Sequence, residues 1–138
     1  MTEKEISKIA QELLTGFNCY INKDSNEIIT IPDIDEFSDN YDLFKDQIKE
    51  IKRNRKRYRE IERMDSHDSF KVMERFADSV SDDSLREKLL IALQRPKPFA
   101  NFKFEINNSG PYRQMWFDFQ QEQQVEWVKD QLALDNLE

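Results

Sequence analysis

Half of the chain's 16 aromatic side chains lie between Phe99 and Trp127, many of them three or four positions apart. This spacing places side chains along one side of an α-helix, so the segment predicts helices that pack through aromatic residues. The 138 residues include only two glycines and four prolines. A chain of this length can bury a sizeable core, and we expect one cooperative, mostly helical domain over residues 1–138.

The N-terminal segment predicts a helix with defined ends. Thr2 and Glu5 form a capping-box pair, in which the Thr hydroxyl accepts from a backbone N–H and the Glu side chain reaches back. Gly16 suits a left-handed helix end. The intervening apolar residues recur at helical spacing: Ile6, Ile9, Ala10, Leu13 and Leu14.

A β-hairpin is predicted next. Residues 19–21 and 28–31 are β-prone runs on either side of a turn-rich segment, in which Asn26 can adopt a positive φ. Pro32 ends the second run. A further β-like run at residues 57–64 offers a third strand.

Helical patterns dominate the rest of the chain. Ser38 or Asp39 can cap the first of these helices, Asp65 the next, and Pro111 suits the start of the last. Their expected core positions are Tyr41, Phe44, Ile48, Ile51, Phe70, Met73, Phe76, Ala77, Val80, Leu85, Leu89, Ala92, Leu93, Phe99, Phe102, Ile106, Tyr112, Met115, Trp116, Phe119, Val128 and Leu132. We therefore expect an α+β fold, a mostly helical single domain with a small N-terminal β-hairpin or three-stranded sheet.

Residues 45–63 form a basic block in an acidic protein. The block has nine basic and four acidic residues, a net charge of +5, and since the chain carries −7 the remainder carries −12. Such a surface suits an acidic protein partner or, with Tyr41 and Tyr58 nearby for stacking, a nucleic acid. The candidate binding residues are Lys52, Arg53, Arg55, Lys56, Arg57 and Arg59.

The block also has a purely structural interpretation. Cations near the end of a helix complement its dipole, and neighbouring acidic segments can neutralise them. A sequence pI near 4.9 is far from the basic character of most nucleic-acid binders. An acidic protein partner, whose contact stays local, therefore suits this charge distribution better than a nucleic acid.

The residues available for chemistry are few. With one cysteine, Cys19, and one histidine, His67, the chain cannot assemble a Cys/His zinc site, and we expect no metal and no cofactor. His67 lies beside two carboxylates but lacks a partner nucleophile, which favours a surface residue over an acid–base catalyst. Four aspartates are of the type that holds a hard cation, but their positions fit helix N-termini instead: Asp65, Asp68, Asp82 and Asp83.

Two tryptophans lie eleven residues apart on the last predicted helix. Trp116 and Trp127 are therefore separated by about three turns and lie near one stripe. Core packing and an aromatic groove for a ligand are both compatible with this spacing. The nearby cluster of Gln120, Gln121, Gln123 and Gln124 predicts a solvated helix face.

From Tyr58 onward the order of caps and core aromatics resembles a known family. The matching features are Tyr58-Arg59-Glu60-Ile61, Asp65-Ser66, Phe70, Met73, Phe76, Leu85-Arg86-Glu87-Lys88-Leu89, Ala92-Leu93, Phe99, Phe102, Trp116, Phe119 and Trp127. With its N-terminal helix and hairpin, the chain is similar to UPF0158, an uncharacterised bacterial protein family. It departs from that family at Asn26 and at Arg95-Pro96-Lys97-Pro98, where glycine-containing turns are common. The resemblance implies a compact α+β fold and transfers no catalytic residue.

The sequence favours one class of function over two others. No combination of nucleophile, base and oxyanion donor is recognisable, so an enzyme is the least favoured class. We expect a cytoplasmic bacterial protein without membrane contact, acting as a non-enzymatic protein-binding or interaction module. The alternative is a nucleic-acid-associated protein that uses residues 45–63.

Overall fold

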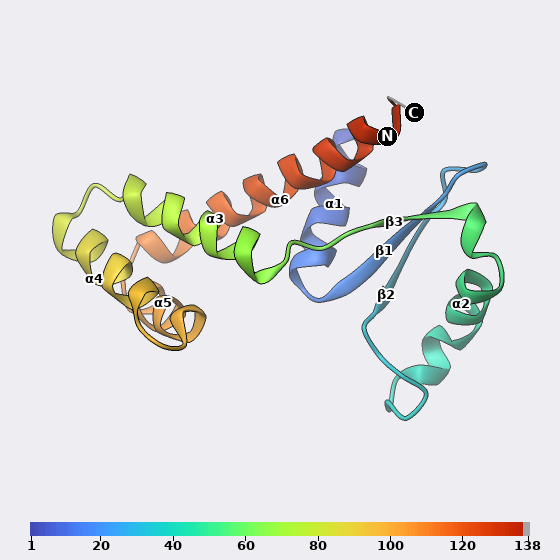
Figure 1. Ribbon diagram of the computed structural model, residues 1–138, viewed down its shortest axis with the longest axis horizontal. Helices are drawn as coiled ribbons and strands as arrows, with labels where there is room; N and C mark the ends of the chain where they lie inside the picture. Colours follow the sequence, from blue (N-terminus) through green and yellow to red (C-terminus); the bar gives the residue numbers. More distant parts are fainter. Residues whose placement is uncertain (137–138) are drawn as a thin grey trace. The chain divides into compact units, whose positions relative to one another are not determined.

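The computed structural model describes residues 1–136 and confirms a mostly helical α+β fold with a three-stranded sheet. The chain divides into two compact units. The terminal unit comprises Met1–Arg63 together with the C-terminal residues from Gln124 onward, and the middle unit comprises Met64–Gln123. Helix α6 (Tyr112–Asn136) contributes its first half to the middle unit and its second half to the terminal unit (Figure 1).

Helix α1 (Glu3–Leu14) has the predicted ends. The N–H of Glu5 donates to the Thr2 hydroxyl oxygen at 3.1 Å, and the N–H of Thr2 donates to the Glu5 carboxylate at 3.0 Å. Gly16 has a φ of 95°, which only glycine adopts without strain. The predicted capping box and left-handed helix end are both confirmed.

The sheet has the strand order β2-β1-β3, with both pairs antiparallel. Its strands are β1 (Phe17–Asn22), β2 (Ile28–Pro32) and β3 (Tyr58–Ile61). Asn26 has a φ of 63° in the hairpin turn, as predicted. The pairing of Cys19 with Ile61 and of Tyr20 with Ile29 assigns alternate β1 residues to opposite faces of the sheet.

Different helices cover the two faces of the sheet. On one face Cys19, Ile21 and Ile61 pack with α1 and with Val128 of α6. On the other face Ile29 and Ile31 pack with α2 (Tyr41–Arg53), which lies on the opposite side of the sheet from α1 (Figure 1). The terminal unit therefore has two hydrophobic clusters separated by the sheet.

The middle unit is entirely helical in its regular elements. It consists of α3 (Ser66–Ser79), α4 (Asp83–Gln94), α5 (Pro98–Asn107) and the first half of α6. The Asp65 and Asp82 side chains cap α3 and α4, as expected from their positions. Phe102, which is fully buried, and Trp116 lie 4.9 Å apart between ring centroids at the centre of the unit.

Some predictions about individual residues are wrong. Neither Ser38 nor Asp39 caps α2, because Asn40 occupies the N-cap without a side-chain bond and the Ser38 hydroxyl contacts Asp35. Met115 is exposed, although a core position was expected. Phe99 is also partly exposed, since α5 turns only its Phe102 and Ile106 side inward.

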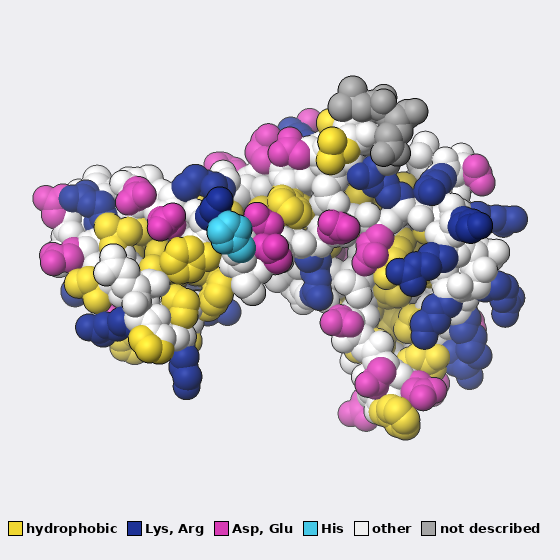
Figure 2. All heavy atoms as spheres, in the orientation of Figure 1, with side chains coloured by type: hydrophobic (Ala, Val, Ile, Leu, Met, Phe, Trp, Pro, Cys, Tyr) yellow, Lys and Arg dark blue, Asp and Glu magenta, His cyan; other side chains and the backbone are white. Residues whose placement is uncertain are grey.

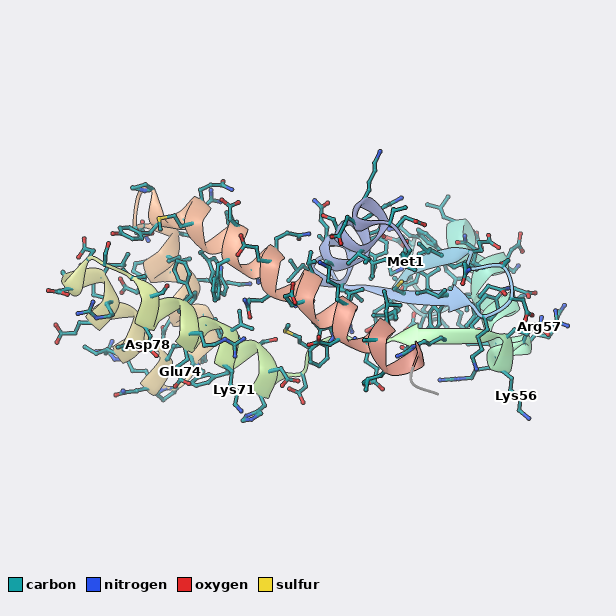
Figure 3. All side chains as sticks on the ribbon, turned by 90° about the horizontal axis from the view of Figure 1, so that it is seen from above. Met1, Lys56, Arg57, Lys71, Glu74 and Asp78 are labelled. Carbon is teal, nitrogen blue, oxygen red and sulfur yellow. The ribbon has the colours of Figure 1, made fainter. Side chains whose placement is uncertain are left out.

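The outer face of α3 is polar. Lys71, Glu74 and Asp78 are exposed and lie along one side of this helix (Figure 3).

Within residues 1–136, no helix is both long enough and apolar enough to cross a membrane. That residues 1–138 unfold as one domain stays a prediction.

Candidate binding surface

The basic block is centred on a tight turn between α2 and β3. Lys52 and Arg53 lie in the last turn of α2, and Arg55, Lys56 and Arg57 form the short 3-10 helix η1. All five side chains are exposed, and we call this set the basic surface. Figure 2 shows Lys and Arg side chains gathered over α2 and η1, and Figure 3 shows Lys56 and Arg57 projecting from the end of the terminal unit.

Local hydrogen bonds fix the turn that carries the basic surface. The N–H of Asn54 donates to the Glu50 carbonyl at 3.0 Å, and its side-chain amide donates to the Glu50 carboxylate at 2.9 Å. The Tyr58 hydroxyl donates to the same carboxylate at 3.2 Å. The Glu50 carboxylate therefore accepts hydrogen bonds from two neutral side chains at the end of α2, those of Asn54 and Tyr58.

The hairpin supplies one further cation that the sequence analysis missed. The N–H of Lys23 donates to the Arg57 carbonyl at 2.8 Å, which continues the pairing of Asn22 with Tyr58. Lys23 is exposed beside η1, although it lies far from the basic block in sequence. Only the antiparallel register of β1 and β3 brings it there.

The cations of the basic surface are not neutralised by contact. Among the described residues, no carboxylate lies within 4.0 Å of the charged nitrogens of Lys52, Arg53, Arg55, Lys56 or Arg57. Elsewhere in the basic block, Arg63 pairs with Asp33 at 3.6 Å. The expected neutralisation by neighbouring acidic segments therefore does not take the form of ion pairs at the basic surface.

Arg59 has a different environment from the other five candidate residues. It lies on β3, is half-buried, and its guanidinium donates to the Gln131 carbonyl of α6 at 2.6 Å. This bond ties the edge strand to the C-terminal half of α6. The structure thus brings five of the six candidate residues together and gives Arg59 a structural contact.

The aromatic residues near the basic block face inward. Tyr41 and Tyr58 are half-buried against the cluster formed by Ile29, Ile31, Ile48 and Ile51. Burial and the neighbouring Glu50 carboxylate raise the pKa of the Tyr58 hydroxyl above its usual value. Neither ring is presented as an open stacking platform beside the cations.

The other candidate residues have mainly structural surroundings. His67 is exposed in the first turn of α3. The N–H of Asp68 donates to the Asp65 carboxylate at 2.8 Å and lowers the pKa of that carboxyl. The N–H of Leu85 donates to Asp82 at 3.0 Å, and Asp83 pairs with Arg86. Among residues 1–136, no group of three or more His, Cys, Asp and Glu side chains is placed to hold a metal ion.

The two tryptophans belong to different units. Trp116 is buried against Phe76 and Phe102 in the middle unit, which confirms core packing for this residue. In the terminal unit, the indole N–H of Trp127 donates to the Glu62 carbonyl at 2.7 Å. Gln131 donates to the same carbonyl at 2.9 Å. Trp127 thus secures the chain just beyond β3.

An open cavity of about 910 Å³ lies in the terminal unit between α1, the hairpin end and α6. Its walls include apolar Ile6, Ile21 and Leu132 together with cationic Lys23 and Lys129. Lys129 is paired with Glu3 at 3.3 Å. Sequence reasoning missed this cavity because its walls come from segments at opposite ends of the chain.

The single cysteine is buried and poorly ionised. Cys19 lies at the centre of the sheet, where burial and the Glu12 carboxylate raise the pKa of its thiol to about 12. The reactive thiolate is therefore scarce near neutral pH. We expect native protein at pH 8 to resist a thiol-specific disulfide reagent, and unfolded protein to react with one equivalent. Native reaction at the rate of free cysteine would show that Cys19 is accessible.

Comparison with known proteins identifies a family. The model of the family described as "Uncharacterised protein family (UPF0158)" matches residues 3–138, nearly the whole chain. No curated protein and no solved structure matches.

Proposed function

We propose that this chain, which belongs to the uncharacterised protein family UPF0158, is a non-enzymatic interaction protein whose basic surface binds an acidic segment of a protein partner. The same proposal places it in the bacterial cytoplasm. A chain with one cysteine forms no internal disulfide, which suits a reducing compartment.

The observation that carries the proposal is the exposed and unneutralised state of the basic surface. Five cations stand on one anchored turn, and none has an ion-pair partner among the described residues. A carboxylate-rich segment would supply the missing counter-charges without displacing an existing ion pair. The guanidinium group of arginine also presents two parallel N–H donors, which match the two oxygens of a carboxylate.

A nucleic acid is the second candidate, and two observations weigh against it. The rings expected to stack on bases, Tyr41 and Tyr58, pack inward against the core. The sequence outside residues 45–63 carries a net charge of −12, which repels an extended polyanion over distances comparable to the Debye length. A short acidic protein segment avoids most of this repulsion because its contact stays local.

Replacing Arg53, Arg55, Lys56 and Arg57 by Gln is expected to abolish binding of a short poly-glutamate peptide, measured by titration calorimetry. These side chains are exposed, so the free energy of unfolding should change by only about 0–1 kcal/mol for each residue. We expect wild-type protein to bind single- and double-stranded oligonucleotides no more tightly than about 10⁻⁴ M.

A matched control distinguishes the effect of losing the basic surface from the effect of changing the net charge. Replacing Lys4, Lys8, Lys71 and Lys103 by Gln removes the same charge from exposed positions elsewhere. This control should retain peptide binding, and equal loss in both variants would contradict the proposal. Tight oligonucleotide binding that falls steeply with salt, and that the first variant loses, would establish the nucleic-acid alternative instead.

A further inference from the structure

A second surface, in the middle unit, combines exposed apolar side chains with cations. A groove of about 360 Å³ runs between α4 and α5. Its apolar lining comes from Ile91 and Ala92 of α4 and Phe104 of α5, and its polar lining comprises Lys88, Arg95, Asn101 and Glu105. Phe104 is 66% exposed, and Ile91 is also exposed. Figure 2 shows hydrophobic side chains interspersed with Lys and Arg over α4 and α5.

The groove has a rigid and basic frame. Pro96 lies in the turn between α4 and α5 and Pro98 is the first residue of α5. The Asn101 side chain donates to the Pro96 carbonyl at 2.9 Å. Residues 88–105 include four basic residues and one acid, a net charge of +3. Lys88 and Arg95 form no ion pair with a described residue. The groove therefore suits a segment that has both apolar side chains and carboxylates.

We call the loop before α2 together with the first three residues of that helix, residues 33–43, the acidic loop, and this segment has the complementary composition. Residues 33–43 contain five acidic residues and no basic one. Phe37 is 87% exposed and Leu43 is 76% exposed, so two large apolar side chains stand among these acids. The N–H of Phe37 donates to the Asp35 carboxylate at 2.9 Å, which holds the loop in a defined turn. Among the acids of the loop, Asp33 is paired with Arg63.

We infer that the loop of residues 33–43 in one copy of this chain docks in the α4–α5 groove of a second copy. Phe37 then packs against Ile91 and Phe104, and the loop carboxylates face Lys88 and Arg95. The charges of the two segments, −5 and +3, are opposite, and both segments expose apolar side chains that water solvates poorly.

A second copy is favoured as the occupant because the chain itself carries both halves of the contact. The basic surface is a poorer receptor for this loop, since none of the large exposed hydrophobic side chains among the described residues belongs to α2 after Leu43 or to η1. The contact joins unlike surfaces, so each copy offers one loop and one groove. This inference uses residues other than those of the proposed function.

Sedimentation velocity of the full chain over a range of concentrations tests the contact. Wild type should gain mass with increasing concentration. Phe37→Ser and Phe104→Ser should each raise the apparent dissociation constant by about tenfold or more, because each removes a central apolar side chain. A mixture of the two variants should form pairs, since one retains the groove and the other retains the loop.

Two further variants complete the design. Leu134→Ser removes a side chain that is 60% exposed and outside both segments, so it should associate like wild type. Arg95→Glu leaves the apolar side chains intact and should weaken association through charge alone. A wild-type chain that stays monomeric would overturn the inference, as would variants that associate normally or a mixture that fails to pair. Association that Leu134→Ser weakens equally would also overturn it.

Discussion

Replacing Phe102 by Ala is expected to lower the free energy of unfolding by about 3–5 kcal/mol. The Phe102 side chain is fully buried, and its ring lies 4.9 Å from that of Trp116 in an edge-on arrangement. Truncation removes buried apolar surface and leaves a cavity that the neighbouring helices fill only in part. Since domains are typically stable by about 5–15 kcal/mol, the loss is a large share of the total. Denaturant unfolding followed by tryptophan fluorescence measures it.

The same helix provides a matched control. Phe104 lies two residues further along α5 and is mostly exposed, so Phe104→Ala should change the free energy of unfolding by about 0.5 kcal/mol or less. The identical chemical change therefore isolates the effect of burial. A cost below about 1 kcal/mol for Phe102→Ala would show that its surroundings collapse into the space or that the side chain is exposed.

Local signals in the sequence predicted the elements of the fold well. Thr2 with Glu5, Asn26, Asp65 and Asp82 each act within a few residues of their own position, through one hydrogen bond or one backbone angle. Such interactions need no knowledge of the rest of the chain. The α2 cap was mispredicted because the Ser38 hydroxyl bonds to Asp35, and Asn40 occupies the N-cap position without a side-chain hydrogen bond.

The number of aromatic residues in the sequence predicted a larger buried core than the structure has. Apolar residues at helical spacing show which face can be buried, and the size of that face depends on how many neighbours cover it. On α6, Trp116 is buried while Met115 and Phe117 remain exposed. The Arg113 guanidinium lies 4.8 Å from the centre of the Phe117 ring, a contact that accommodates this aromatic at the surface. Gln124, expected on a solvated face, is buried instead.

The candidate surface was predictable only in part. Most of its charged residues are neighbours in sequence, whereas the contacts that surround them come from distant segments of the chain. Charge counting identified Lys52 and the η1 cations, which are adjacent in sequence. Lys23 joins them through the β1–β3 register, and Arg59 is engaged by the Gln131 carbonyl. The α4–α5 groove likewise depends on how two helices pack, so neither the spacing of Ile91 nor that of Phe104 indicated it.

Replacing Ile61 by Ala is expected to cost about 2–5 kcal/mol of unfolding free energy. Ile61 is buried on the edge strand β3, pairs with Cys19, and packs in the cluster that contains α1 residues and Val128 of α6. Its side chain therefore joins the N-terminal helix, the sheet and the C-terminal half of α6. Ile91→Ala, the same change at an exposed position, should cost about 0.5 kcal/mol or less.

The Ile61 and Phe102 variants together test whether residues 1–138 unfold as one domain. Ile61 belongs to the terminal unit and Phe102 to the middle unit, while the continuous helix α6 provides Val128 to the first core and Trp116 to the second. Because α6 contributes to both cores, its unwinding exposes both, and we expect each variant to shift one shared transition with little change in its denaturant dependence. Calorimetry and circular dichroism should then coincide. Two transitions, of which Ile61→Ala lowers one and Phe102→Ala the other, would instead make the two units independent in stability.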